Sequence, residues 1–129
     1  MLTHHNPATI VAPASRYSQA VEAPAGCRWL YISGQIGVGS DGAIEKGFEA
    51  QARRTWSNLI ATLNTAGMGP RDLMRINIYL TRADDLAAAR LTRDEALAGV
   101  APPAGTLVVV AALAHPDLLI EIEAVAAKV

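Results

Sequence analysis

The chain has 129 residues, which is enough for one domain with a hydrophobic core but not for two, so we expect a single domain over residues 1–129. Its net charge is −1 and it has no run of Lys or Arg, which argues against general nucleic-acid binding because such binding depends on clustered basic residues. The sequence shows no signal-peptide pattern and no apolar run of about 20 residues, and Cys27 is its only cysteine, so we expect a cytoplasmic protein without a membrane span.

The first third of the chain predicts two strands after an irregular lead-in over Met1–Ala14. Tyr17–Val21 and Arg28–Ile36 are typical of short strands, and the Pro and Gly within Ala23–Gly26 favour a tight turn between them. We therefore expect the two strands to pair as a hairpin. Gly34 interrupts the second strand, which indicates a bulge or a place where another group approaches the backbone.

A helix is predicted from about Gly47 to Ala66, because apolar residues recur there at helical spacing and form one stripe. Gly67 suits the position just after the helix, where a left-handed backbone conformation is common. The stripe consists of Phe48, Ala52, Trp56, Leu59, Ile60 and Leu63.

A strand and a second helix are predicted next. Met74–Leu80 alternates between apolar and polar residues, as half-buried strands do. Thr81 followed by Asp84 resembles a capping arrangement and predicts a helix that continues to about Leu97, before Gly99 and two prolines. The side chains expected to face inward are those of Met74, Ile76, Ile78 and Leu80.

The stretch Ala104–Ala126 predicts two further strands joined by a short turn. Thr106–Val110 is a β-branched apolar run, and Leu119–Val125 alternates strictly. His115–Asp117 provides the break, since its Pro cannot donate to a strand ladder and Asp favours turns. The alternation places two carboxylates, those of Glu121 and Glu123, on one face of the last strand.

The predicted order β-β-α-β-α-β-β indicates an α+β fold in which two helices cover one face of a sheet. The other face has a mixed character that is typical of a contact with a symmetry-related subunit. The apolar content of 51% also suggests burial between subunits, so we expect a closed homo-oligomer. The residues expected on that face are Arg75, Asn77, Tyr79, Glu121 and Glu123.

Five segments in order resemble the Rid family (reactive intermediate deaminases, also called the YjgF family), over nearly the whole chain from about residue 17 to 126. They are YSQAV (17–21), ISGQI (32–36), EAQARRTWSNLIATLNTAG (49–67), INIYLT (76–81), and PAGTLVVVAAL with IEIEAVA (103–113 and 120–126). The resemblance implies a chorismate-mutase-like fold and a homotrimer with clefts between subunits. It also implies hydrolysis of short-lived enamine or imine acids such as 2-aminoacrylate to a 2-keto acid and ammonia, without metal or organic cofactor. Family members have also been called translation inhibitors or L-PSP endoribonucleases.

The chemistry of an α-imino acid explains which residues the family site uses. An Arg binds the carboxylate in bidentate fashion, and a carboxylate orients or deprotonates water. The resemblance assigns the water-handling role to Glu121, the first Glu of EIEA, and places Tyr17 and the backbone of Gly34 in the pocket.

The carboxylate-binding Arg of the family is missing from this chain. Where the family has Pro-Ala-Arg followed by Ser or Thr, this sequence has Pro103-Ala104-Gly105 followed by Thr106, and Leu107 takes the place of a small polar or thiol residue. Gly105, Thr106 and Leu107 are the expected substrate-binding positions, and the pocket would be wider and less polar there. The candidates to replace the missing guanidinium group are Arg16, Arg28, Arg75 and Arg90.

Each candidate also has a structural interpretation. Glu121 can be a solvated strand residue, and Tyr17 can be an interface aromatic with a satisfied hydroxyl group. Gly34 can serve a bulge alone, and Glu123 fits a structural contact better than a catalytic one. His4, His5 and His115 have no metal-ligand spacing, and there is no phosphate-binding loop, so we expect neither a metal nor another cofactor.

Three functions follow from these observations. The first is a Rid-family hydrolase acting on a small imine, enamine or similar reactive compound, without strict dependence on an α-carboxylate. The second is a trimer of the same fold that binds a metabolite or a partner without turnover, which the loss of the Arg favours and the retention of Glu121 disfavours. The third and least favoured is an endoribonuclease, because the sequence has neither a basic groove nor a stripe of stacking aromatics.

Overall fold

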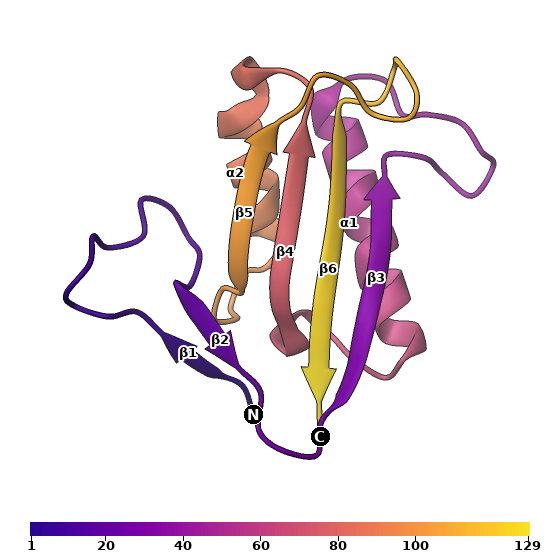
Figure 1. Cartoon of the computed structure of the whole chain (residues 1–129). Helices are drawn as coiled ribbons and strands as arrows, with labels where there is room; N and C mark the ends of the chain where they lie inside the picture. The colour runs from indigo at the N-terminus through magenta and orange to yellow at the C-terminus, as the bar shows by residue number, and fades with distance from the viewer.

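The computed structural model describes all residues from 1 to 129 and has six strands and two α-helices (Figure 1). In chain order these are β1 (Thr3–His5), β2 (Ala20–Glu22), β3 (Arg28–Ile36), α1 (Phe48–Thr65), β4 (Leu73–Leu80), α2 (Leu86–Ala96), β5 (Ala104–Val109) and β6 (Ile120–Lys128). Short 3₁₀ turns at Pro70–Asp72 and Ala83–Asp85 precede β4 and α2.

Four of the strands form one sheet in the order β3-β6-β4-β5, with both helices behind it in Figure 1. The last strand, β6, lies in the middle and runs antiparallel to β3 and β4, whereas β5 runs parallel to β4. The core fills the space between the sheet and the helices. Its completely buried side chains include Leu59 and Leu63 of α1, Leu80 of β4, and Ile120 and Ile122 of β6. The predicted α+β class with helices on one face is confirmed.

Helix α1 agrees with the sequence pattern to within one residue at each end. The stripe residues Ala52, Trp56, Leu59 and Leu63 are all buried, as their spacing predicts. Gly67 follows the helix with a φ of 69°, in the left-handed region that favours glycine, and its N–H donates to the carbonyl of Asn64. The helix therefore ends where Gly67 was expected to end it.

The predicted hairpin between the first two strands is wrong. β2 begins later than expected and pairs with β1, a strand within the segment expected to be irregular, so that Val21 lies opposite His4. β3 pairs with β6 along its length instead, because that pairing places Ile32 in the core beside Ala124. The long pairing with β6, which buries apolar side chains of β3, outweighs the local tendency of the Pro-Gly turn to form a hairpin.

The two strands predicted within 104–126 are present but are not neighbours. A segment of ten residues, 110–119, leads from β5 across the end of β4 to β6, so β4 lies between them. The predicted short turn is therefore wrong. The alternation is correct, since Ile120, Ile122 and Ala124 are buried while Glu121 and Glu123 lie on the opposite face.

The predicted cap of the second helix is also not formed. Arg82 binds both carboxylate oxygens of Asp85, at 2.8 and 3.1 Å, and the chain makes a 3₁₀ turn there before α2 begins at Leu86. An Arg–carboxylate pair with two hydrogen bonds competes well with a Thr–Asp cap, because it is charge-assisted and bidentate. The helix consequently starts about four residues later than the sequence suggested.

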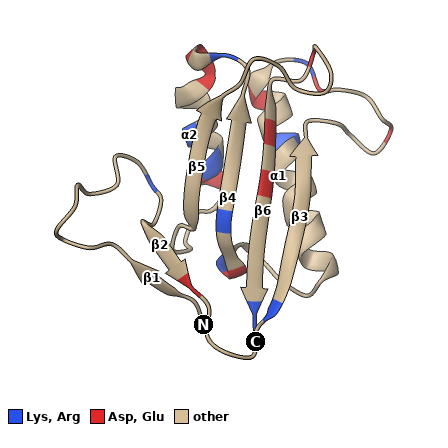
Figure 2. Cartoon of the chain, in the orientation of Figure 1, with Lys and Arg blue, Asp and Glu red and all other residues tan.

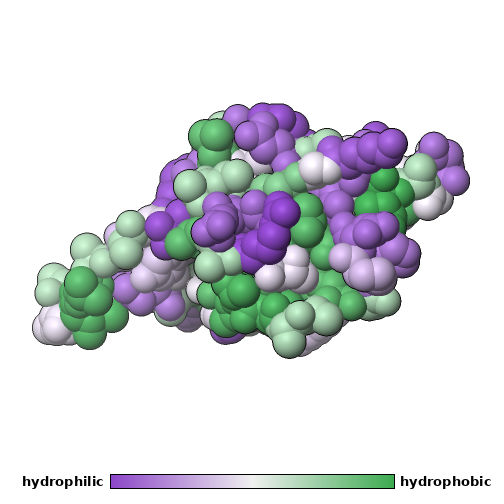
Figure 3. Space-filling model, turned by 90° about the horizontal axis from the view of Figure 1, so that it is seen from above, coloured by the Kyte–Doolittle hydropathy of each residue, from purple (hydrophilic) through white to green (hydrophobic).

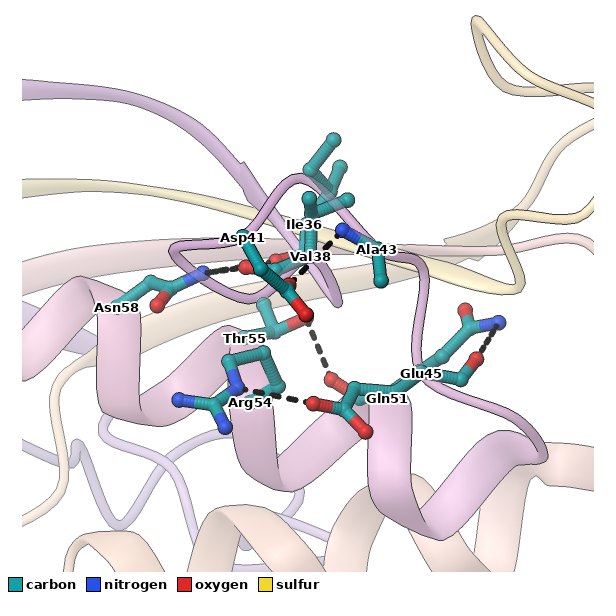
Figure 4. A network of polar contacts seen from close by, with 9 residues as sticks. All are labelled: Ile36, Val38, Asp41, Ala43, Glu45, Gln51, Arg54, Thr55 and Asn58. Atoms are coloured by element: carbon teal, nitrogen blue, oxygen red, sulfur yellow. Dashed lines mark hydrogen bonds and ion pairs between the residues drawn. The ribbon is translucent and has the colours of Figure 1, made fainter.

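Gln51 on α1 binds both the loop after β3 and the segment before β6, and Figure 4 shows its contact with Glu45 in that loop. Its amide nitrogen donates to the carbonyls of Glu45 and Asp117, and its amide oxygen accepts from the N–H of Leu119 at 2.8 Å. Asn58, about two helical turns further along α1, donates to the carbonyls of Ile36 and Val38. These contacts fix the loop after β3 and the entry to β6 relative to one helix, and thus fix the start of β6 beside the end of β3.

The face of the sheet opposite the helices is open in the single chain. It combines a polar centre with large exposed apolar groups, including Tyr31, whose exposed fraction is 78%, and Val108. The N-terminal segment with β1 and β2 projects from the body as an arm and exposes Ile10 and Val11 (Figure 3). Exposed aromatic and aliphatic groups of this kind are typical of surfaces that contact another protein.

Candidate functional site

A pocket of about 280 Å³ lies between α2 and the edge strand β5. Four of the six predicted site residues line it, and they come from two distant parts of the sequence. The pocket residues are Ser15, Arg16, Tyr17, Ile76, Ile78, Arg90, Arg93, Pro103, Gly105, Thr106 and Leu107. The volume suits a small metabolite rather than a polymer.

Ser18 fixes Tyr17 beside β5. The N–H of Ser18 donates to the carbonyl of Pro103 at 3.0 Å, its hydroxyl donates to the carbonyl of Pro102, and its backbone forms a parallel bridge with Ala104. Ser18 is buried, so these bonds are shielded from water. Tyr17 is therefore held at the pocket by its neighbour, although it precedes β2 and is not itself in a strand.

Gly105 lies opposite Ile76 in the parallel β4–β5 pair, and its side-chain direction points toward the helix side of the sheet. A Cβ atom built there would lie 3.5 Å from Cγ1 of Ile76, which is an ordinary van der Waals distance. Its φ is not positive, so the backbone also accepts other residues. Nothing in the local structure requires glycine, and the missing side chain leaves space in the pocket.

Gly34 and Glu121 form a second group, away from the pocket. The β3–β6 register shifts between Ile32 and Gln35, which confirms the predicted bulge at Gly34. The carboxylate of Glu121 lies directly over Gly34, where an added Cβ would be 2.6 Å from Cδ of Glu121. Glu121 makes no hydrogen bond or ion pair within the chain, whereas Glu123 on the same face accepts two hydrogen bonds. Glycine therefore leaves room for the Glu121 carboxylate in this position, and any larger residue would have to displace the end of that side chain.

The two groups lie on opposite faces of one sheet. Glu121 pairs with Tyr79 on the open face, whereas Gly105 pairs with Ile76, which belongs to the core on the helix side. One strand, β4, lies between Glu121 and Gly105, and the two are also offset by about three residues along the strands. Within one chain, Glu121 thus does not meet the pocket that contains Tyr17 and Gly105.

Glu123 has a structural role on the open face, as the sequence suggested. It accepts hydrogen bonds from the Tyr79 hydroxyl at 2.7 Å and from the Asn77 amide at 3.0 Å. These bonds lower the pKa of the Glu123 carboxyl, because they stabilise its charged form, and the same carboxylate raises the pKa of Tyr79. Arg75 continues the network to Asn77 and to the Thr106 hydroxyl.

The lowered pKa of Glu123 predicts a pH dependence of stability. The folded chain holds the ionised form more tightly than the unfolded chain does, so this stabilisation is present above the ordinary pKa of 4.5 and is lost as the pH falls through the folded value. In urea unfolding between pH 3 and 6, Glu123→Gln should flatten this part of the curve, while Glu49→Gln on the exposed side of α1 should not. A curve for Glu123→Gln that parallels the unmodified protein would contradict the assignment.

The four arginines considered as replacements for the family Arg separate clearly. Arg28 and Arg75 lie away from the pocket, since Arg28 reaches the carbonyl of Ala66 and Arg75 lies on the open face. Arg16 and Arg90 do line the pocket. Sequence reasoning missed the third arginine of the pocket, Arg93. It lies three residues after Arg90 on α2, so the i, i+3 spacing was the signal that places both on one helix face.

Two further observations concern metal ligands and membrane-spanning helices. No three His, Cys, Asp or Glu side chains lie together in a way that would hold a metal ion. Neither α-helix combines the length and apolar character needed to cross a membrane.

Comparison with known proteins gives a consistent result. Residues 8–128 match the family described as endoribonuclease L-PSP. A RutC family protein of Pyrococcus horikoshii is 36% identical over 118 residues, which are 90% of each chain. Among solved structures, the Rid-family protein YyfB of Yersinia pestis, described as of unknown function, has a TM-score of 0.90 at 34% identity over 98% of both chains. TdcF of Escherichia coli, solved with bound serine, has a TM-score of 0.76 at 27% identity over 93% of this chain and 91% of TdcF.

Proposed function

Because the chain belongs to the Rid family, whose members are also grouped as endoribonuclease L-PSP and RutC proteins, we propose that it hydrolyses a small reactive imine or enamine. The reaction takes place in a cleft between subunits of a homotrimer. Its activity on imino acids is reduced or altered relative to Arg-containing members, because Gly105 replaces the family Arg.

The separation of the two residue groups is the observation that carries this proposal. Tyr17 and Gly105 line a pocket on one side of the sheet, and Glu121 lies with Gly34 on the other. Neither group alone provides both a cavity for a small molecule and a free carboxylate. A neighbouring subunit that presents its open face to the pocket would bring the two together, as a symmetric oligomer allows.

In this arrangement Glu121 orients and deprotonates the water that attacks the imine carbon, and the backbone at Gly34 contacts the substrate. The attack forms a carbon–oxygen bond while the π electrons of the C=N bond pass to nitrogen, which takes up the proton that Glu121 removed from water. Transfer of the remaining hydroxyl proton to nitrogen then lets the carbonyl group form as the C–N bond breaks and ammonia leaves. Tyr17 is placed to donate a hydrogen bond at the pocket. Gly105, Thr106 and Leu107 form the β5 wall against which the substrate lies.

The direct test generates 2-aminoacrylate in situ from serine with a lyase and follows the release of the 2-keto acid. Addition of the protein should accelerate this release above the spontaneous rate. A neutral imine, formed from an aldehyde and a small amine, should be hydrolysed as well. No acceleration with either compound would overturn the enzymatic proposal.

The main alternative is a trimer of the same fold that binds a metabolite or a partner without turnover. The missing side chain at position 105 favours this alternative, and the bound serine in the TdcF structure shows that a related protein accommodates an amino acid. Calorimetric binding of a small amino or keto acid, together with no acceleration in the assay above, would favour it. An endoribonuclease remains the least favoured function, and salt-dependent RNA binding would be its sign.

The trimer itself is a prediction that can be tested directly. We expect light scattering to give three times the mass of the chain, with the open face around Arg75 and Glu123 buried between subunits. Tyr31→Glu places an unpaired charge at an exposed aromatic on that face and should produce monomers. Leu91→Glu, at an exposed position on α2, is the control and should remain trimeric. A stable monomer for the unmodified protein would remove the intersubunit cleft.

A further inference from the structure

The pocket between α2 and β5 is basic. Arg16, Arg90 and Arg93 line it, and no Asp or Glu does. Figure 2 shows the basic residues of α2 behind β5. The nearest acidic partner is Asp94, which binds Nε of Arg93 at 3.0 Å and is itself half-exposed. A pocket with three guanidinium groups and no carboxylate on its walls favours a negatively charged occupant.

The three arginines are engaged to different extents. Arg16 uses both terminal nitrogens on the carbonyls of Leu97 and Val100, at 2.9 and 2.5 Å, and so ties the N-terminal segment to the end of α2. This makes Arg16 a structural residue rather than the replacement for the family Arg. Arg90 is exposed and makes no hydrogen bond within the chain.

Arg93 is the exceptional member of the three. Only 6% of it is exposed, and its Nη2 is buried without any hydrogen-bond acceptor. A buried, charged N–H group that has lost its water without gaining an acceptor is costly, so such groups are rare in folded proteins. Arg93 is one of the residues that line the pocket, so a small rotation of its guanidinium group would let an oxygen atom of a bound anion supply the missing acceptor.

We infer that Arg93 binds the carboxylate of a small substrate in this pocket, with Arg90 at the mouth. The carboxylate then lies against α2 and not at the β5 wall, where a side chain at position 105 would hold it. Gly105, which faces the pocket without a side chain, leaves the space that this placement needs. The inference rests on the proposed function and adds to it a specificity-determining residue from a different element.

The test measures equilibrium binding of pyruvate, a stable 2-keto acid, by NMR titration of the intact protein. Arg93→Met should weaken binding at least about tenfold and Arg93→Lys should weaken it less, because Lys keeps the charge but loses the bidentate contact. Methyl pyruvate, which lacks the charge, should bind at least about tenfold more weakly than pyruvate and should not respond to Arg93→Met. Arg71→Met, at an exposed residue outside the pocket, is the charge-matched control and should bind pyruvate normally.

Equal pyruvate affinity for the unmodified protein and Arg93→Met would overturn the inference. Inorganic phosphate that binds much more tightly than pyruvate, and displaces it, would also overturn the inference and would indicate a phosphate site. If Arg93→Met does not fold, the side-chain Nε–H signal of Arg93 in the unmodified protein decides, since it should shift with pyruvate. The binding measurement does not require turnover, so the two proposals can fail separately. Arg93-dependent pyruvate binding without imine hydrolysis would contradict only the proposed function. Imine hydrolysis with unchanged pyruvate binding and KM in Arg93→Met would contradict only this inference.

Discussion

Replacing Glu121 with Ala is expected to abolish the imine hydrolysis of this protein, with a loss of about a hundredfold or more in kcat, as is typical for removal of a general base. The stability of the folded structure should hardly change. The Glu121 carboxylate makes no hydrogen bond or ion pair within the chain, so the free energy of unfolding should stay within about 0.5 kcal/mol. Glu49→Ala, on the exposed side of α1, is the matched control and should keep full activity. Unchanged kinetics in Glu121→Ala would refute the catalytic role.

Gly34→Ala tests the role of the Glu121 carboxylate by displacing it instead of removing it. Its methyl group would occupy the position of the Glu121 carboxylate, with Cγ of Glu121 only 2.9 Å from the new carbon. The flexible end of the Glu side chain can move aside, so the trimer should persist while kcat falls toward that of Glu121→Ala. The double variant should then be no slower than Glu121→Ala alone, because both changes remove one function. Additive losses would show that Gly34 acts independently of Glu121.

The second large effect concerns position 105. A charge-assisted bidentate contact between Arg and a carboxylate contributes around 3 kcal/mol, or roughly a hundredfold in kcat/KM when it is made in the transition state. We therefore expect this protein to hydrolyse 2-aminoacrylate-type imino acids more slowly than relatives with the family Arg, by up to about a hundredfold and by less to the extent that Arg93 replaces this contact. Gly105→Arg should recover part of this difference. The strand accepts a side chain there, since the backbone is not in a left-handed conformation and an added Cβ meets Ile76 at an ordinary distance.

The recovery should remain incomplete for two physical reasons. Leu107 takes up space beside the new side chain, and Arg16, Arg90 and Arg93 already make the pocket positive, so a fourth guanidinium is repelled. Ala25→Arg, in the exposed turn before β3, adds the same charge elsewhere and should leave kcat/KM unchanged. If the unmodified protein already matches an Arg-containing relative, the argument from position 105 fails.

Periodicity and turn chemistry predicted most elements but not their pairing. The apolar stripe of α1 and the alternation of β4 and β6 gave the correct elements and buried faces, since these patterns record which side of each segment meets the core. Met74 is the exception: the register shifts between Leu73 and Arg75, so Leu73 is buried in place of Met74. Strand neighbours depend instead on contacts far apart in the sequence. The β2–β3 hairpin was wrong for this reason, because β6 offers β3 a longer and better buried partner than β2 does.

The candidate site was predictable only as a set of residues. The family resemblance pointed to Tyr17, Gly34 and Glu121, but it could not show that Glu121 and Tyr17 lie on opposite faces of the sheet within one chain. Arg93 was missed because a charged residue in a surface helix normally faces water, and nothing in the local sequence distinguishes a buried Arg from an exposed one. Its importance appears only when the packing of α2 against β5 is known.

The position of β6 between β3 and β4 also determines the order in which the sheet can form. β3 and β4 do not pair with each other; both pair with β6, which follows them in the chain, and β4 has β5 as its other neighbour. A nascent chain that ends before Ile120 therefore exposes two apolar strands with unpaired edges, which are prone to associate with other chains. The four-stranded sheet can therefore close only after β6 is present, when this strand inserts between two strands that precede it in the chain.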